Sequence, residues 1–261
     1  RENSSAPPMP HPRYRVRSIH YRSGDGYDLP LRRSVLAENT VVKAGEWFSA
    51  SDLQRTYNNF ARLGAVRYTN ITFREDTLHN LDTDIRLSMR KPNTIAFQPE
   101  GTNTAGDFGA AATLTYQNRN LFRGSELLSI ELRGAFEAIK GLEGYERGDY
   151  EEYGVEARFQ MPRLMTPFLS RKGRRGSTAS TELSVAWNLQ NRPEFHRRVF
   201  SAGLKYRWST RDGRVQYKLD VLDLSYVYMP WISATFKHDC LGSVSNRNAI
   251  LRYNYEDLFI M

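Results

Sequence analysis

Alternation of apolar and polar residues dominates the chain after about residue 93. In segment 126–138 every second residue is apolar or small, and most residues between them are polar or charged. Segments 152–161, 182–190 and 200–208 repeat this pattern. Because the side chains of a strand point alternately to its two faces, each segment predicts a β-strand with one apolar and one polar face.

The alternation also assigns individual side chains to these two faces. The predicted apolar set is Leu128, Ile130, Leu132, Phe159, Leu183, Val185, Leu204 and Tyr206, and the predicted polar set is Glu131, Arg133, Glu156, Arg158 and Lys205. A soluble antiparallel sandwich and a membrane barrel both produce such a pattern. Predicted strands of ten or more residues favour the barrel, because soluble strands average about five or six. Aromatic residues placed toward strand ends also favour it, namely Trp208, Tyr226, Tyr228 and Trp231.

A helical period marks one segment before residue 93. Apolar residues recur there at the spacing of one helix face, at Leu53, Tyr57, Phe60, Ala61 and Leu63. Ser49 or Ser51 is the candidate N-cap, and Gly64 stands where a left-handed C-cap is expected. Strands are predicted at 14–21, 66–73 and 83–89, so the elements of this part of the chain follow the order strand, helix, strand, strand. The apolar stripe of the helix is expected to pack on the sheet that these strands form.

These patterns divide the chain into three parts. Residues 1–13 are proline-rich and predict a linker or tail, residues 14–92 predict a compact α+β domain, and residues 93–261 predict a series of strands. Strands are expected to start near Ile95, Phe108, Glu126, Glu152, Thr181, Val199, Val215 and Ala249. The chain begins without Met and ends within a strand-like segment, so both ends are expected to be cut.

Composition narrows the class of protein. Twelve per cent aromatic content argues against disorder, and no window supplies the ~18–20 apolar residues of a membrane-spanning helix. The formal net charge of +8 would suit nucleic acid, but the basic residues are spread along the whole chain and form no known nucleic-acid module. Cys240 is the only cysteine, so an intrachain disulfide is excluded.

Four stretches resemble the BamA/TamA superfamily of outer-membrane proteins. Residues 95–109 resemble the opening of its barrel, where the first strand turns into the second, and residues 118–126 resemble its first periplasmic turn. The turn carries the family pattern at Asn120, Leu121, Phe122 and Gly124. Residues 60–68 are similar to part of a POTRA (polypeptide-transport-associated) domain, although residues 65–68 stand where that pattern usually has Phe and then Val. Residues 230–233 bring the chain closest to the TamA-like lipoprotein branch (TamL).

The resemblance implies a fold and a function. It implies an α+β POTRA domain in the periplasm, followed by an incomplete antiparallel transmembrane β-barrel containing about the first eight of sixteen strands. It also implies a non-enzymatic factor, without cofactor, that inserts or exports client barrel or secreted proteins. Outer-membrane lipid and a TamB-like inner-membrane protein are the further partners expected, and nucleic acid is not.

The first barrel strand is the candidate lateral gate. A barrel that inserts other strands needs a sheet edge that opens, because an unpaired edge templates strand pairing. The candidate edge residues are Ile95, Phe97, Pro99 and Gly101. Pro99 lacks a backbone donor and is tolerated mainly at edges, although it could instead begin the first external loop.

Two other function classes stay open on the sequence. A barrel phospholipase would need a Ser and a His on one face, and His196 and Ser201 are predicted on opposite faces. A passive pore needs neither a gate nor a catalytic pair. His238, Asp239 and Cys240 are expected to lie in a loop without metal, and the basic run 171–175 is expected in a periplasmic connection, where it could meet anionic lipid.

Overall fold

The computed structural model describes residues 13–24, 26, 28–104, 107–139, 149–165, 178–210 and 214–236. The chain forms two compact units, and the boundary falls after Arg90. The first is a small β-α-α-β-β unit, and the second is a seven-stranded antiparallel sheet.

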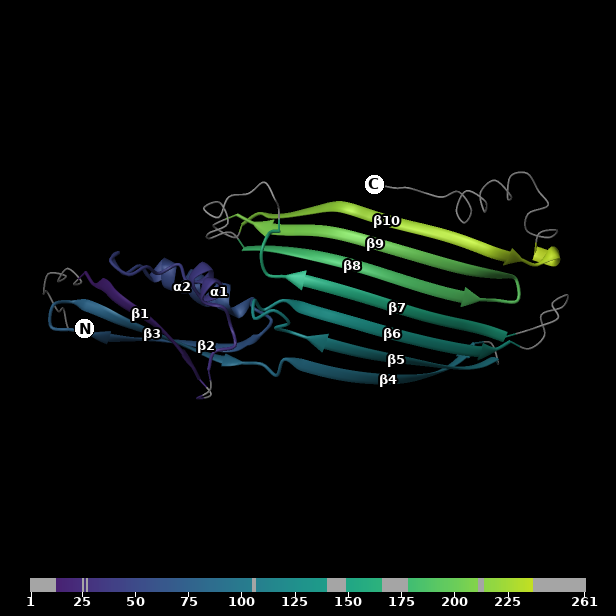
Figure 1. Ribbon diagram of the computed structural model, residues 1–261, viewed down its shortest axis with the longest axis horizontal. Coiled ribbons are helices and arrows are strands. Elements are labelled where there is room, and N and C mark those ends of the chain that lie inside the picture. The colour runs from purple at the N-terminus through teal and green to yellow at the C-terminus, as the bar shows by residue number, and fades with distance from the viewer. Residues whose placement is uncertain are drawn as a thin grey trace, which may run out of the picture. The chain divides into compact units, whose positions relative to one another are not determined.

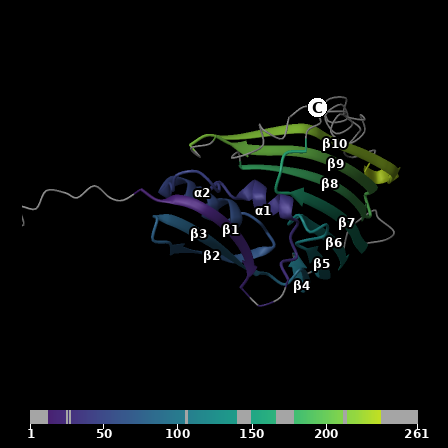
Figure 2. The same cartoon turned by 60° about the vertical axis from the view of Figure 1, so that its left-hand side comes forward.

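The first unit is a three-stranded sheet with two helices on one face (Figure 2). Its strands are β1 (Arg15–Ser23), β2 (Val66–Glu75) and β3 (Asn80–Met89), in the order β1-β3-β2. β3 pairs in parallel with β1 and antiparallel with β2. The sheet therefore has two edges, and β2 is one of them.

The helix α2 (Ala50–Ala61) confirms the predicted stripe except at Ala61, which is exposed, and it corrects the predicted helix end. Ser49 is the N-cap, and its side chain accepts a hydrogen bond from the Asp52 N–H. The helix ends at Ala61 in a tight turn, where Leu63 N–H donates to the Phe60 carbonyl. Gly64 does not have a positive φ, so the predicted left-handed C-cap is wrong.

A second helix, α1 (Arg33–Asn39), was not predicted. It is seven residues long, and its N-cap, Arg32, makes no side-chain cap hydrogen bond. Val35 and Leu36 are its buried residues, so it carries too few apolar positions for a periodic signal.

The core of the first unit lies between the helices and the sheet. Phe60, Ile85 and Leu87 are fully buried, and Leu63 is nearly so. Leu53 and Tyr57 pack against this cluster, as expected for the helix stripe. Burying such side chains stabilises the fold by about 1.5–3 kcal/mol each before the entropy of ordering is subtracted.

The second unit is a single antiparallel sheet in which every strand pairs with its neighbours in sequence (Figure 1). The strands are β4 (Asn93–Thr104), β5 (Asp107–Asn118), β6 (Leu127–Ala138), β7 (Asp149–Met161), β8 (Thr178–Asn191), β9 (Phe195–Ser209) and β10 (Gln216–Ile232). All exceed the length of an average soluble strand. Seven of the predicted strand starts correspond to these elements, and the one near Ala249 lies outside the described residues.

The register aligns apolar residues into rows that cross the whole sheet. One row, here called the central row, consists of Phe97, Leu114, Leu132, Val155, Trp187, Phe200 and Tyr226. All seven are directly paired with their neighbours, so they share one face, here called the apolar face. Every residue predicted in the apolar set lies on this face, and every residue predicted in the polar set lies on the other.

The ends of the sheet are named by strand direction. The near end is where β4, β6, β8 and β10 begin, and the far end is where β5, β7 and β9 begin. Trp208 lies at the near end and Trp231 at the far end, as predicted. Tyr226 belongs to the central row, so its prediction at a strand end is wrong.

The described residues contain no helix long and apolar enough to cross a membrane. A short helical turn at 234–236 follows β10.

Candidate functional site

β4 and β10 are the two outer strands of the seven-stranded sheet, and no described strand pairs with the outer side of β4. Its other side pairs with β5 without a break, from Asn93 opposite Asn118 to Thr104 opposite Asp107. Pro99 and Gly101 both lie inside this ladder, so Pro99 does not begin a loop. A proline within a strand is tolerated where its nitrogen faces away from the neighbouring strand. The missing donor at Pro99 therefore falls on the open side.

The four predicted edge residues lie on the apolar face. Ile95 and Phe97 are 72% and 65% exposed, compared with 40% for Leu114 of β5 in the same row as Phe97. The excess exposure on β4 comes from the missing neighbour on one side. Pro99 and Gly101 continue the same face with little side-chain bulk, and an added Cβ at Gly101 would meet no atom within 4 Å.

The four predicted turn residues connect β5 to β6 at the near end of the sheet. The Asn120 side chain accepts a hydrogen bond from Ser125 N–H at 3.0 Å. The Phe122 ring packs edge-on against Phe159 of β7, with centroids 6.1 Å apart. Leu121 is 40% exposed and Gly124 is buried.

Glu126 organises this turn, a role that the sequence did not reveal. Its side chain is among the most buried carboxylates, at 3% exposure, and one oxygen accepts from Gly124 N–H at 2.9 Å and from Phe122 N–H at 3.2 Å. Arg123 and Ser125 adopt positive φ, at 60° and 61°. This backbone is costly for residues other than glycine. The carboxylate bonds offset that strain by satisfying two N–H groups that the turn would otherwise leave unpaired.

Gly124 fits this turn because it has no side chain. A Cβ at position 124 would lie 2.1 Å from Glu126 Oε1, so any larger residue would displace the carboxylate. The turn motif thus consists of Asn120, Phe122, Gly124 and Glu126 acting on one short backbone segment.

The polar face carries charged residues that pair across strands. Glu182 is 14% exposed and pairs with Arg207 at 2.9 Å and with Arg158 at 4.0 Å. Arg158 also pairs with Glu156, and Arg133 of β6 reaches Glu100 of β4 at 3.8 Å. Glu131 lies directly opposite Glu156, and no cation in the described part of the sheet pairs with Glu131. The arrangement resembles a hydrated wall with local charge pairs, and not a paired acid and base.

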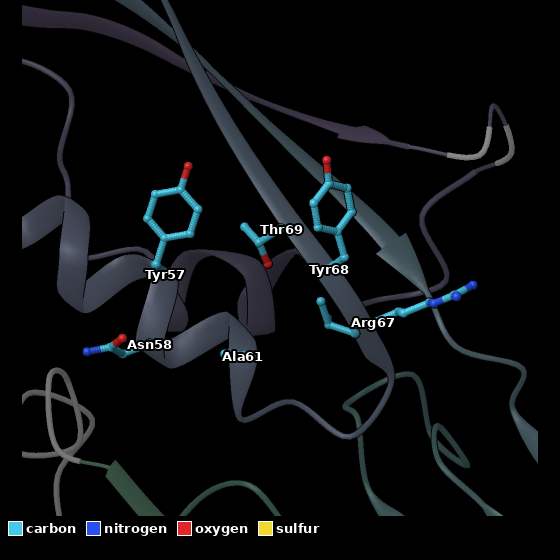
Figure 3. Close-up of a pocket in the computed structure, with 7 residues that line it drawn as sticks. Tyr57, Asn58, Ala61, Arg67, Tyr68 and Thr69 are labelled. Carbon is cyan, nitrogen blue, oxygen red and sulfur yellow. The ribbon is translucent and has the colours of Figure 1, made fainter.

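The outer side of β2, an edge of the sheet in the first unit, lies beside a shallow pocket of about 280 Å³ (Figure 3). The pocket is lined by residues of α2 and β2, namely Tyr57, Asn58, Ala61, Val66, Arg67, Tyr68 and Thr69. The Tyr57 hydroxyl accepts from Ile71 N–H at 3.0 Å and donates to the Ile71 carbonyl at 3.5 Å. It therefore occupies one backbone pairing position of the β2 edge and leaves the position beside Thr69 open.

In the first unit, Arg17 of β1 forms ion pairs with two carboxylates. The Arg17 guanidinium binds Asp82 and also reaches Asp76 at 2.9 Å. The hydrogen bonds from Arg17 and Ser18 lower the pKa of Asp82 to about 2.

The structure does not bring the alternative catalytic residues together. His196 lies on the apolar face opposite Trp231, and Ser201 lies on the polar face opposite Ser225. Among the described residues no group of three His, Cys, Asp or Glu side chains could hold a metal ion. The segments 171–175 and 238–240 lie outside the described residues.

Comparisons with known proteins give likenesses of fold. No family model and no curated protein sequence matches the chain. The crystal structure of BamA from Haemophilus ducreyi lacking POTRA domains 1–3 is 13% identical in sequence, with a TM-score of 0.36. The match covers 83% of this chain and 47% of the BamA chain. CdiB from Acinetobacter baumannii is 12% identical in sequence, with a TM-score of 0.43, and the match covers 83% of this chain and 48% of the CdiB chain. This chain thus spans about half the length of each, and the comparisons show a likeness of fold to these two structures.

Proposed function

We propose that the seven-stranded sheet is part of the wall of an outer-membrane β-barrel, in a protein of the BamA/TamA superfamily. The apolar rows that cross all seven strands carry this proposal. In a soluble sandwich a second sheet would cover such a face. Among the described residues Val155, Trp187 and Phe200 of the central row stay 39–43% exposed.

The height of the apolar face fits a membrane. On β9 the face runs from Tyr206 near one end to His196 near the other, ten residues along the strand. At a rise of about 3.3 Å per residue and a tilt of about 40°, this spans roughly 25 Å. An apolar band of about 25 Å is typical of outer-membrane barrels. The Trp208–Tyr217 stack and Trp231 lie near its two limits, where aromatic rings favour the interface.

We infer that the β4 edge is a lateral seam through which the barrel assembles or translocates client proteins. Backbone groups left unpaired in lipid cost several kcal/mol each, so a free strand edge must pair with another strand. The missing donor at Pro99 weakens that pairing at one position, which favours exchange of the closing strand for a client strand. The first unit would lie in the periplasm, where its open β2 edge offers a second place for an extended client segment to add. Client barrel or secreted proteins and a TamB-like partner are the expected associates.

A reversible lock tests the seam in the full-length protein. With Cys240→Ser as background, a cysteine replacing Ala96 of β4 is joined by a disulfide to a cysteine on the closing strand. The proposal predicts that client assembly slows when the lock is closed and recovers when it is reduced. The matched control joins Ala96 to its direct partner Thr115 of β5, which should leave assembly unchanged. Equal rates for the locked and reduced seam would make the barrel a passive scaffold or pore.

A further inference from the structure

The chain leaves β7 by folding back over the apolar face. Three hydrogen bonds of 2.9 Å hold this segment, residues 162–165, here called the hook. Met165 N–H donates to the Thr181 hydroxyl, and that hydroxyl donates to the Arg163 carbonyl. The Tyr206 hydroxyl donates to the Met165 carbonyl. Thr181 and Tyr206 are direct partners on β8 and β9, so the hook spans both strands.

The hook lies where the apolar face ends. Thr181 and Tyr206 form the row next to Leu183 and Leu204, at the near end of the sheet. Trp208 stacks on Tyr217 one row further out, with centroids 5.3 Å apart. Thr181 is 2% exposed because the hook covers it. A threonine on a lipid-facing surface would otherwise present its hydroxyl to hydrocarbon, so the hook also satisfies that hydroxyl.

The hook exposes one apolar and one cationic side chain. Met165 is 49% exposed, and Arg163 is exposed, with its guanidinium making no hydrogen bond or ion pair to any described residue. At the boundary of an apolar band, a thioether suits the upper acyl region, and a guanidinium suits phosphate, which it can bind through two parallel N–H groups. An acidic protein partner would match the charge of Arg163 but not the exposed Met165 beside a lipid-facing wall.

We propose that the hook is a binding site for a phospholipid headgroup on the near-end leaflet, with Arg163 binding the phosphate and Met165 reaching the acyl chains. The site rests on the proposed placement of the apolar face in lipid. Thr181 and Tyr206 act as positioning residues, because they hold the hook backbone and do not contact the lipid phosphate themselves.

Depth measurements separate this site from the wall that carries it. Nitroxide labels at Leu132, Arg133 and Met165, each in a Cys240→Ser background in the full chain, are exposed to a water-soluble and a lipid-soluble quencher in vesicles. The wall predicts shielding from the water-soluble quencher at Leu132 and access at Arg133. The hook predicts a value between these two at Met165. Shielding at Leu132 combined with full water access at Met165 would refute the hook and leave the wall intact, whereas full water access at Leu132 would refute the wall.

Lipid selectivity tests the role of Arg163. Vesicles contain phosphatidylcholine with or without phosphatidylglycerol, and spin-labelled forms of both lipids report association with the protein. Arg163→Gln should lower the preference for phosphatidylglycerol about fivefold, the equivalent of about 1 kcal/mol for one basic residue near an anionic surface. Arg86→Gln is the matched control, since Arg86 is an exposed arginine of the first unit whose guanidinium likewise has no partner among the described residues. An unchanged preference in Arg163→Gln would overturn the proposal.

Removing the support should have the same effect without removing the charge. Thr181→Val keeps the side-chain shape but deletes the hydroxyl that joins Arg163 to Met165. It should raise water access at a Met165 label and reduce the lipid preference, while Thr181→Ser should retain both. A folded barrel, shown by its shifted gel mobility without heating, is the requirement for comparing the variants. If Thr181→Val and Thr181→Ser behave alike in a folded barrel, the hydroxyl does not hold the hook.

Discussion

Leu132 lies in the central row of the apolar face, and replacing it by Arg tests whether that face meets lipid. Leu132 is three rows from the Tyr206 row and two rows from the His196 row, so it lies close to the middle of the proposed membrane span. A cationic residue at the midplane of an outer-membrane barrel costs about 2–4 kcal/mol, and one near the interface costs about 0–1 kcal/mol. Leu132→Arg should therefore lower the free energy of unfolding in vesicles by about 2–4 kcal/mol.

Phe136 supplies the matched control on the same strand. It lies on the same face, four residues nearer the far end, and is 47% exposed compared with 44% for Leu132. In water the two Arg substitutions should cost about the same, within roughly 0.5 kcal/mol, because surface changes rarely cost more. In lipid Leu132→Arg should cost at least about 1 kcal/mol more than Phe136→Arg. Reversible denaturant unfolding in vesicles measures both values, and equal costs would refute the assignment of this face to lipid.

Three further predictions concern the turn, the first unit and pH. Gly124→Ala should destabilise the sheet by about 1–3 kcal/mol, because the new Cβ displaces the Glu126 carboxylate from two buried N–H groups. Gly101→Ala is the control and should change stability by less than about 0.5 kcal/mol, because a Cβ there meets no atom within 4 Å. Denaturant unfolding compares the two variants. Tyr57→Phe should cost about 1–3 kcal/mol by removing the partner of Ile71 N–H, and faster amide exchange at Ile71 would report it. The pKa of Asp82 lies at about 2, below its ordinary 3.8, so the stabilising effect of the ionised Asp82 is complete above about pH 4 and is lost as pH falls through about 2. Asp82→Asn should therefore flatten the acid unfolding profile between these pH values. An unchanged profile would contradict this role.

Much of the second unit follows from the sequence because its signal is local and repeated. Alternation over ten or more residues fixes which side chains share a face, and the register then aligns Leu132 with Val155 and Leu114. The same holds for the helix stripe around Phe60, where one apolar face must be buried. These predictions needed only the periods of strand and helix.

The parts that the sequence did not reveal depend on backbone geometry between distant or unusual residues. The role of Glu126 requires positive φ at Arg123 and Ser125. Neither residue is glycine, so nothing in the sequence indicated this backbone conformation. The hook requires Thr181 to meet the chain 16 residues earlier, at Met165. The helix α1 is too short for a periodic pattern, and the end of α2 is set by a tight turn where Gly64 suggested a different one.

The strand order of the seven-stranded sheet has a consequence for the time course of folding. Every pairing joins strands that are consecutive in the chain, and the connections range from residues 105–106 to residues 162–177. Each added strand therefore closes only a short loop, and a doubling of loop length costs only about 0.6 kcal/mol of closure entropy. The sheet can grow from β4 toward β10 without waiting for a distant contact, unlike β1, which pairs with β3 across both helices. The outer side of β4, the first strand of this sheet to leave the ribosome, is used by no described strand and still stands open when β10 has been added.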